Sequence, residues 1–313
     1  MVTFARSGPV PGADRRRAPA AREALVDHAF GIGWAITRHA PEPVAERLLE
    51  HAADRITRQR GSGVEQLERN LARAAPELDA DDLRELTQTA MRSYFRYWHE
   101  AFRLPSWTRE RVVDGVVTTN ETPLREGFAR GQGAIVALPH MANWDLAGAW
   151  ACLTGMPVST VAERLRPESL YERFVAYRRQ LGMEVIALTG EGSPLRALRE
   201  ALLRGRLVCL LSDRDLSGNG VEVDLLGEPA CLPGGPAVLA RMTGAPLVAA
   251  SLCFSGPLLR IDFSDPVPVR PGPSGLAAMT QDVADWFTAG VRRNPADWHM
   301  LQPVFVGDRG LRR

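Results

Sequence analysis

The chain has 313 residues, of which 45% are hydrophobic and 24% are charged, and its formal net charge is +1. This composition is typical of a folded domain with a buried core, and it excludes a collagen-like or largely disordered chain. A balanced charge gives no overall field that would attract nucleic acid, so no nucleic-acid partner is expected and anions must be bound by local groups.

The four cysteines show no Cys-x-x-Cys spacing, and the six histidines include no His-x-x-x-His pair. Isolated thiols in apolar runs indicate buried cysteines in a reducing compartment. We therefore expect no metal site.

The first part of the chain is expected to be helical. Residues 1–20 are rich in Arg, Pro and Gly and predict a disordered tail rather than a signal peptide. Apolar residues then recur at helical spacing in three stretches: 43–57, 64–71 and 83–102. Before them, Phe30 and Trp34 are flanked by Arg22 and Arg38, so this stripe either packs on the core or lies in a membrane interface. The sequence contains no uninterrupted run of about 18 apolar residues, so we expect no membrane-spanning helix.

From about residue 130, strand-like and helix-like runs alternate. The expected strands are 134–138, 158–162, 184–188, 207–211, 221–226, 247–254 and 258–263, and the expected helices are 145–154, 168–181, 194–204, 235–243 and 275–293. This alternation predicts an α/β fold with a mainly parallel or mixed central sheet flanked by helices. The last two strands, which a short Gly/Pro turn joins, are expected to form an antiparallel edge.

We expect a single domain over residues 21–307. It would have an N-terminal helical part at 21–104 and an α/β catalytic part at 105–307, and a short tail at 308–313 would follow.

His140 and Asp145 are the most informative pair in the chain. His140 follows the apolar run 134–138 by two residues, and ligands bind at the carboxyl ends of strands in parallel sheets. Asn143 marks a helix start that it could cap, which would place Asp145 near the positive helix end. We predict that His140 is a general base and that Asp145 fixes its tautomer, although capping alone also explains Asp145. The motif contains no obvious Ser or Cys nucleophile, which favours a base that activates a substrate hydroxyl without an acyl-enzyme.

Several motifs resemble those of a known superfamily. The stretch 139–145, Pro-His-Met-Ala-Asn-Trp-Asp, resembles the His-x4-Asp motif of the glycerolipid and lysophospholipid acyltransferases, and within them the lipid A late acyltransferase branch. Further matches lie at 69–72, 213–216, 220–223 and 226–228. The stretches 161–171 and 295–303 closely resemble the actinobacterial phosphatidylinositol mannoside acyltransferases, and the likeness covers residues 21–307.

The resemblance implies an enzyme that moves a fatty acyl group, such as palmitoyl, from acyl-CoA to the 6-hydroxyl of a mannose on phosphatidylinositol mannoside. Acyl-CoA would be a co-substrate, and no cofactor is implied. The enzyme would associate peripherally with the cytoplasmic face of the plasma membrane. The alternatives are an acyltransferase for another glycolipid such as a lipid A precursor, an acyl-CoA thioesterase with the same dyad, and a non-catalytic membrane-associated protein.

The resemblance also assigns site residues. His140 would be the base and Asp145 its partner, while Glu163 and Arg178 would shape the site near the acceptor. Asp213 stands where close relatives carry Glu, and its implied role is that of an acidic partner to Arg178 or to the acceptor hydroxyl. A structural ion-pair network is the alternative for Glu163, Arg178 and Asp213.

Five further residues are candidate contacts with substrate or CoA: Asn143, Arg164, Arg166, Trp298 and His299. The two arginines could bind CoA phosphates, as could the helix entrance at 233–236, where a tight turn is an equally good explanation. Trp298 and His299 could instead hold the C-terminal segment in place.

Overall fold

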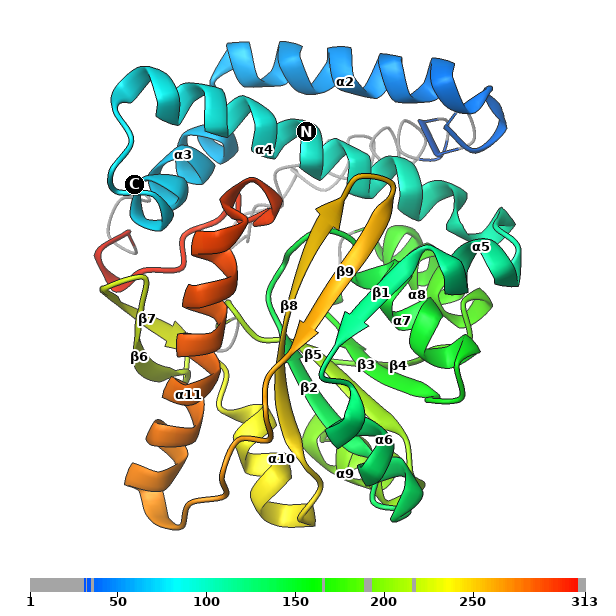
Figure 1. The fold of residues 1–313 in the computed structure, drawn as a ribbon, viewed down its shortest axis with the longest axis vertical. Helices are drawn as coiled ribbons and strands as arrows, with labels where there is room; N and C mark the ends of the chain where they lie inside the picture. Colours follow the sequence, from blue (N-terminus) through cyan, green and yellow to red (C-terminus); the bar gives the residue numbers. More distant parts are fainter. Residues whose placement is uncertain are drawn as a thin grey trace, which may run out of the picture.

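The computed structural model describes residues 31, 33, 34, 37–164, 167–188, 193–215 and 218–308. The predicted tail at 1–20, most of residues 21–40 at the start of the predicted helical part, and the candidate Arg166 lie outside these residues. The fold is α/β: a seven-stranded sheet lies between helices, and an N-terminal helical layer crosses one end of it (Figure 1).

The central sheet is mixed but mostly parallel, as the strand–helix alternation predicts. Its strand order is β1-β9-β8-β2-β5-β3-β4. Every residue of β2 is buried, which is why its sequence is a continuous apolar run rather than an alternating one. The strands are β1 (Val116–Thr119), β2 (Ala134–Leu138), β3 (Val158–Ala162), β4 (Glu184–Ala187), β5 (Leu207–Leu211), β8 (Leu247–Ser255) and β9 (Leu258–Phe263).

Two strand predictions need correction. The antiparallel β8–β9 pair is confirmed, but it is not the edge of the sheet, because the short strand β1 pairs in parallel with β9 and covers it. The predicted strand at 221–226 does not join the sheet. It forms β6 (Val221–Leu225), which pairs with β7 (Glu228–Leu232) in a separate antiparallel hairpin. Leu226 and Gly227 both have positive φ, 57° and 91°, and this tight turn reverses the chain before it can enter the sheet.

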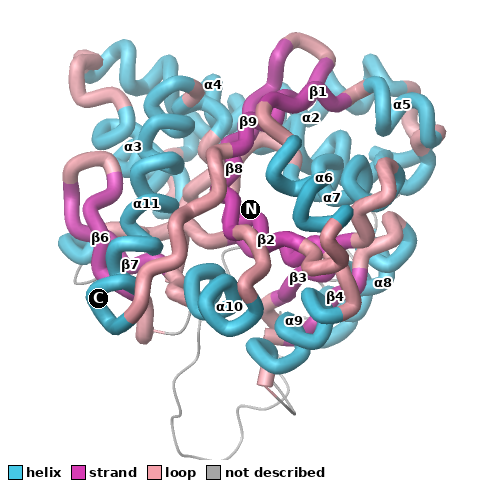
Figure 2. Tube along the Cα trace, turned by 60° about the horizontal axis from the view of Figure 1, so that its bottom comes forward, coloured by secondary structure: helices cyan, strands magenta, loops and turns pink. Residues whose placement is uncertain are grey.

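Helices cover both faces of the sheet. In Figure 2, α6 and α7 lie on one side of β2 and β3, while α9 and α10 lie on the other. The long helix α11 packs on β8, where a Cβ on Gly290 would come within 2.4 Å of Ser251 Cβ, so the close approach requires glycine. The helices of this part are α5 (Arg109–Asp114), α6 (Thr122–Ala129), α7 (Trp144–Leu153), α8 (Glu168–Gln180), α9 (Pro194–Leu203), α10 (Gly235–Thr243) and α11 (Gly272–Arg293).

The N-terminal layer consists of α2 (Glu42–Gln59), α3 (Ser62–Ala74) and α4 (Ala80–Arg103), and it lies across the top of the molecule in Figure 1. The three helices share a small core, as their apolar spacing predicts; its fully buried residues are Ala53, Val64, Leu67, Leu71, Ala90 and Met91. None of the helices among the described residues combines the length and the apolarity needed to cross a bilayer.

Of the two aromatic residues for which a membrane-interface position is the alternative, Phe30 lies outside the described residues and Trp34 lies within them. The Trp34 ring stacks on Phe102 with 4.9 Å between centroids and meets the edge of Tyr177 at 5.4 Å. Trp34 therefore packs against the protein.

Candidate active site

The parallel register of two neighbouring strands brings the two most important side chains together. β2 pairs with β5 so that Leu138 lies opposite Leu211, and the backbone N–H of Ser212 donates to Leu138 O at 2.8 Å. His140 and Asp213 each lie two residues beyond the end of their strand, so they leave the sheet side by side at its carboxyl edge. This is the edge at which parallel sheets bind ligands.

His140 is held by Asp213 through two hydrogen bonds. The Nδ1–Oδ1 distance is 2.6 Å, and the backbone N–H of His140 donates to Oδ2 at 2.9 Å. Trp298 Nε1–H donates to the same Oδ2, also at 2.9 Å. Burial acts to raise the pKa of Asp213, but the His140 ring and these N–H donors outweigh it and hold that pKa below its usual value.

The arrangement fixes the tautomer of the neutral His140 ring. An ionised Asp213 accepts a hydrogen bond from Nδ1–H, which leaves Nε2 as the basic nitrogen. Nε2 has no hydrogen-bond partner within the described residues, and 26% of the His140 side chain is exposed, against 1% of Asp213. The ring is therefore oriented from behind and accessible from the front, as a general base must be.

The predicted pairing of His140 with Asp145 is wrong. Asp145 instead forms an ion pair with Arg178, with 2.8 Å between Oδ1 and Nε, and Tyr97 O–H donates to its Oδ2 at 2.9 Å. Burial acts against the charge of Arg178, yet Asp145 more than offsets it and raises the pKa of the guanidinium. The predicted partnership of Asp213 with Arg178 is wrong for the same reason, because the carboxylate beside Arg178 belongs to Asp145.

Asn143 explains why α7 begins where it does. Its Oδ1 accepts the backbone N–H of Leu146 at 2.9 Å, which confirms the predicted cap, and its Nδ2 donates to Glu100 Oε2 at 2.8 Å. Asn143 is fully buried. A direct contact between Asn143 and substrate therefore does not fit this structure, and its role is to set the start of α7.

Glu163 and Arg164 lie just beyond the end of β3 and are exposed. Glu163 makes an ion pair with Arg214 at 3.4 Å, and Arg164 pairs with Glu168 at 2.8 Å. Neither residue has a described contact with His140 or Asp213.

Trp298 and His299 lie deep in the structure rather than at the surface of a cleft. Trp298 is 1% exposed and forms an antiparallel bridge with Met141. His299 Nε2 lies 2.9 Å from Ser93 Oγ, and burial, assisted by the nearby His140, lowers the pKa of His299 to about 3. Of the two roles that the sequence left open, the structure favours holding the C-terminal segment.

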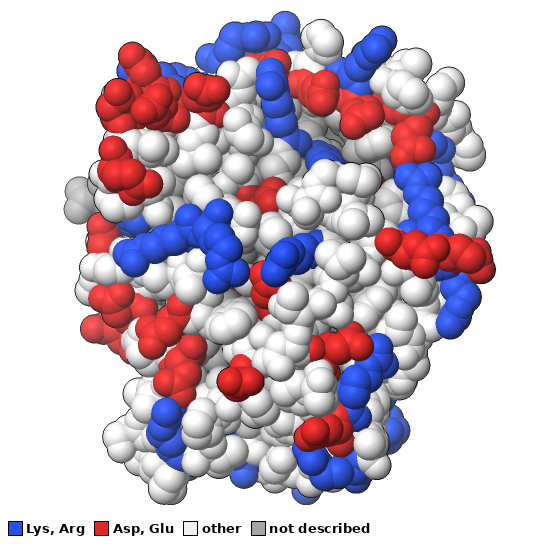
Figure 3. All heavy atoms as spheres, viewed as in Figure 1, with Lys and Arg blue, Asp and Glu red and all other residues white. Residues whose placement is uncertain are grey.

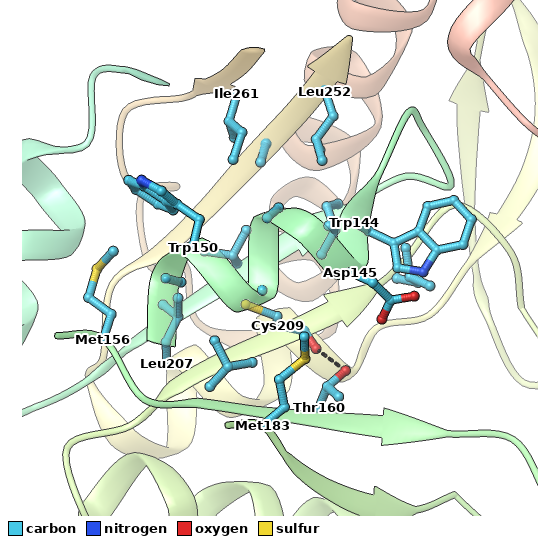
Figure 4. Close-up of a pocket in the computed structure, with 18 of the residues that line it drawn as sticks. Trp144, Asp145, Trp150, Met156, Thr160, Met183, Leu207, Cys209, Leu252 and Ile261 are labelled. Atoms are coloured by element: carbon cyan, nitrogen blue, oxygen red, sulfur yellow. Dashed lines mark hydrogen bonds between the residues drawn. The ribbon is translucent and has the colours of Figure 1, made fainter. Parts of the chain in front are cut away.

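A narrow apolar cavity of about 60 Å³ runs beneath α7 (Figure 4). Trp144 and Asp145 lie at one end of the close-up, and Trp150, Met156 and Leu207 lie at the other. The His140 and Trp144 rings meet edge to face with 5.4 Å between centroids, so the first of these ends adjoins the dyad. The cavity follows α7 from Trp144 to Ala151, which is about 10 Å at 1.5 Å per residue.

The described residues contain no cluster of three or more His, Cys, Asp or Glu side chains arranged to hold a metal ion. For the chain as a whole, the absence of a metal site stays a prediction.

Comparison with known proteins identifies the family. The sequence profile described as "Bacterial lipid A biosynthesis acyltransferase" matches residues 16–306. The chain belongs to this acyltransferase family. It is an enzyme of the acyltransferase class, as the sequence motifs predict.

Two relatives are similar to this acyltransferase over nearly its whole length. A protein of Mycolicibacterium smegmatis named "Phosphatidylinositol mannoside acyltransferase" is 41% identical over 285 residues, which are 91% of this chain and 92% of that protein. A protein of Mycobacterium tuberculosis with the same name is 41% identical over 290 residues, 90% of this chain and 89% of that protein. The predicted resemblance to such proteins is confirmed.

The sequence did not reveal Tyr97 as part of this acyltransferase's site, and it singled out Trp298 without predicting that its partner is Asp213. Tyr97, on α4, bonds to Asp145, and Trp298 bonds to Asp213; each contact joins residues at least 48 positions apart. One signal for the dyad was present, since His140 and Asp213 each follow a predicted strand by two residues. This spacing predicts that His140 and Asp213 meet only if the two strands are neighbours, and their order in the chain does not show that β2 pairs with β5.

Proposed function

We propose that this acyltransferase transfers a fatty acyl group from acyl-CoA to the 6-hydroxyl of a mannose on phosphatidylinositol mannoside. The observation that carries the proposal is the His140–Asp213 pair at the carboxyl edge of the sheet, with Nε2 open to a substrate hydroxyl. The names of the two relatives support the choice of acceptor.

In the proposed mechanism, His140 Nε2 takes the proton of the mannose hydroxyl as its oxygen attacks the thioester carbonyl carbon. The charge of Asp213 stabilises the imidazolium that forms. The tetrahedral intermediate collapses, the carbon–sulfur bond breaks, and the CoA sulfur leaves with the proton that His140 returns. The products are an ester and free CoA. No Ser or Cys side chain among the described residues bonds to His140, which supports direct transfer without an acyl-enzyme.

The acyl chain would lie in the cavity beneath α7. Apolar side chains line most of this cavity, and one of its ends adjoins the dyad through Trp144. Burial of methylene groups there contributes about 0.8 kcal/mol for each group removed from water.

We also propose that α2 holds the enzyme on the cytoplasmic face of the plasma membrane. Val44 and Leu48 are 50% and 58% exposed on its outer side. Basic side chains appear over α2 along the top of Figure 3, and the exposed arginines of the helix include Arg47, Arg55 and Arg58. Exposed apolar side chains with arginines beside them suit a lipid interface, and Glu46 and Glu50 on the same helix limit its attraction to anionic headgroups. Sedimentation with anionic vesicles tests this: Leu48→Asp should weaken binding, and unchanged binding of that variant would refute a role for α2.

The purified protein, incubated with labelled palmitoyl-CoA and a panel of phosphatidylinositol mannosides, tests the activity. We expect an ester to form on mannose. In His140→Ala the rate of this transfer should fall roughly 10²–10⁴-fold while the protein remains folded. Transfer to a lipid A precursor alone would show that the acceptor is that glycolipid and not phosphatidylinositol mannoside. Release of free fatty acid alone would identify a thioesterase and refute the proposal, and transfer unaffected by His140→Ala would refute the mechanism.

A further inference from the structure

A short segment near the C-terminus, Asp297–His299, supports the loop that carries His140. The backbone N–H of Ala142 donates to Asp297 O at 2.9 Å, and the backbone N–H of His299 donates to His140 O at 2.8 Å. Ala142 has φ of 46°, a left-handed conformation that is unfavourable for a residue with a Cβ. The segment therefore holds the loop in a shape that its own sequence does not favour.

Trp298 extends this support to the carboxylate. Its Nε1–H and the backbone N–H of His140 both donate to Oδ2 of Asp213, at 2.9 Å each. Two donors on one oxygen stop the carboxylate from rotating, and they leave Oδ1 directed at the ring. Trp298 is 1% exposed, so it acts on the carboxylate and does not reach the substrate.

The segment is in turn fixed to the N-terminal layer and to β8. The Asp297 carboxylate accepts two hydrogen bonds, one from the Ser93 hydroxyl on α4 at 2.6 Å and one from the backbone N–H of Phe254 at 2.8 Å. Because the single hydroxyl proton of Ser93 goes to Asp297, His299 Nε2 must be the donor in its contact with Ser93 Oγ. His299 makes no bond to a carboxylate within the described part of the chain, so this cluster is an anchor and not a second Ser-His-Asp nucleophile.

We propose that Trp298 is a positioning residue of this acyltransferase: its indole N–H, held in place by the Asp297–His299 segment, aligns Asp213 with the ring of His140. The inference rests on the proposed role of His140 as the base.

The predicted consequence concerns rate and pH together. Without the indole N–H, the carboxylate loses a donor, keeps more of its charge and stabilises the protonated ring more strongly. The titratable groups next to that ring are Asp213 and His299. Loss of the N–H should therefore lower kcat about tenfold and move the acid limb of the pH–rate profile to higher pH, with KM for acyl-CoA unchanged.

Trp298→Phe tests this, because it removes the N–H and keeps most of the buried ring. Trp286→Phe is the matched control, since the partly buried Trp286 Nε1–H has no hydrogen-bond partner among the described residues. We expect the shifted acid limb and the lower kcat in Trp298→Phe only. Identical profiles for the two variants, or a loss of rate that only follows the folded fraction, would overturn the proposal.

If Trp298→Phe does not fold, Ser93→Ala is the second test, because it loosens the same Asp297–His299 segment. We then expect a smaller decrease in kcat and a smaller shift of the acid limb. An unchanged pH–rate profile in Ser93→Ala would refute the positioning role of Trp298. The wild-type enzyme separates the two proposals. A wild-type protein with no transferase activity would refute the proposed function, whereas an active wild type with an unaffected Trp298→Phe would refute only the role of Trp298.

Discussion

Two aspartates of this enzyme are equally buried but have different partners. Asp213, at the catalytic edge formed by the ends of β2 and β5, has 1% of its side chain exposed and faces His140, which can be neutral or charged. Asp145, at the end of the α7 cavity, has 2% exposed and faces Arg178, which is always charged. A partner that can gain and lose a proton makes the first pair suited to chemistry, while a permanent charge makes the second a structural pair. Closeness in sequence to the base therefore did not identify its carboxylate.

The largest effect on stability is expected at the α7 cavity. Asp145→Asn leaves the charge of Arg178 buried without compensation and should lower the free energy of unfolding by about 3–5 kcal/mol. Asp213→Asn should lower it less, by about 1–3 kcal/mol, because an imidazole, unlike the guanidinium of Arg178, carries no permanent charge and the change removes hydrogen bonds rather than an ion pair. Urea denaturation of both variants at pH 7 measures the difference. An equal or reversed order would show that the two carboxylates do not differ as described.

At the catalytic edge, His299 links stability to pH. The pKa of His299 is lowered to about 3 in the folded state, against about 6.5 in the unfolded chain. The stability that depends on neutral His299 is fully present above pH 6.5 and is lost as the pH falls toward 3. Between pH 7 and pH 5, protonation of His299 in the unfolded chain should lower the free energy of unfolding by about 2 kcal/mol. His299→Gln should lack this part of the pH dependence. Equal pH slopes for the two proteins in urea denaturation would contradict a neutral, buried His299.

A smaller effect should separate chain-length selection from catalysis. A Cβ on Gly148 would lie 2.6 Å from Cε of Met183, and both residues line the α7 cavity. Gly148→Ala should push the flexible methionine into the cavity, cost about 1 kcal/mol in stability and favour shorter acyl-CoA donors.

Competition assays with acyl-CoA donors of graded length measure this preference. Gly148→Ala combined with Met183→Ala is the matched control and should restore long-chain donors. An unchanged preference in Gly148→Ala would mean that the acyl chain binds elsewhere.

The sequence predicted much of this fold from continuous apolar runs. The bounds of β2, β3, β5 and β9 match the predicted ones, because each run is bordered by turn residues. Strands β1 and β7 were missed. The first consists of strand-forming Val and Thr but has only four residues, which is too short for a clear pattern, and the second begins with Glu228 and Pro229, which disfavour a strand.

The site was predicted in its residues but not in its pairings. His140 was identifiable from its place after a strand. The partnership with Asp213 was not, because β5 lies beside β2 although β3 and β4 come between them in the chain. Contacts of Tyr97 and Trp298 likewise depend on where distant segments pack, which no local pattern records.

The most direct test of the central claim is the pH–rate profile of Asp213→Asn beside that of Asp145→Asn, each measured on folded protein with palmitoyl-CoA as donor. The neutral amide in Asp213→Asn cannot stabilise a protonated ring, so we expect a roughly 10²-fold lower kcat and an acid limb displaced to lower pH. In Asp145→Asn the acid limb should stay at the wild-type position. A displaced acid limb in Asp145→Asn, with the wild-type profile retained in Asp213→Asn, would contradict the assignment of Asp213 as the partner of His140.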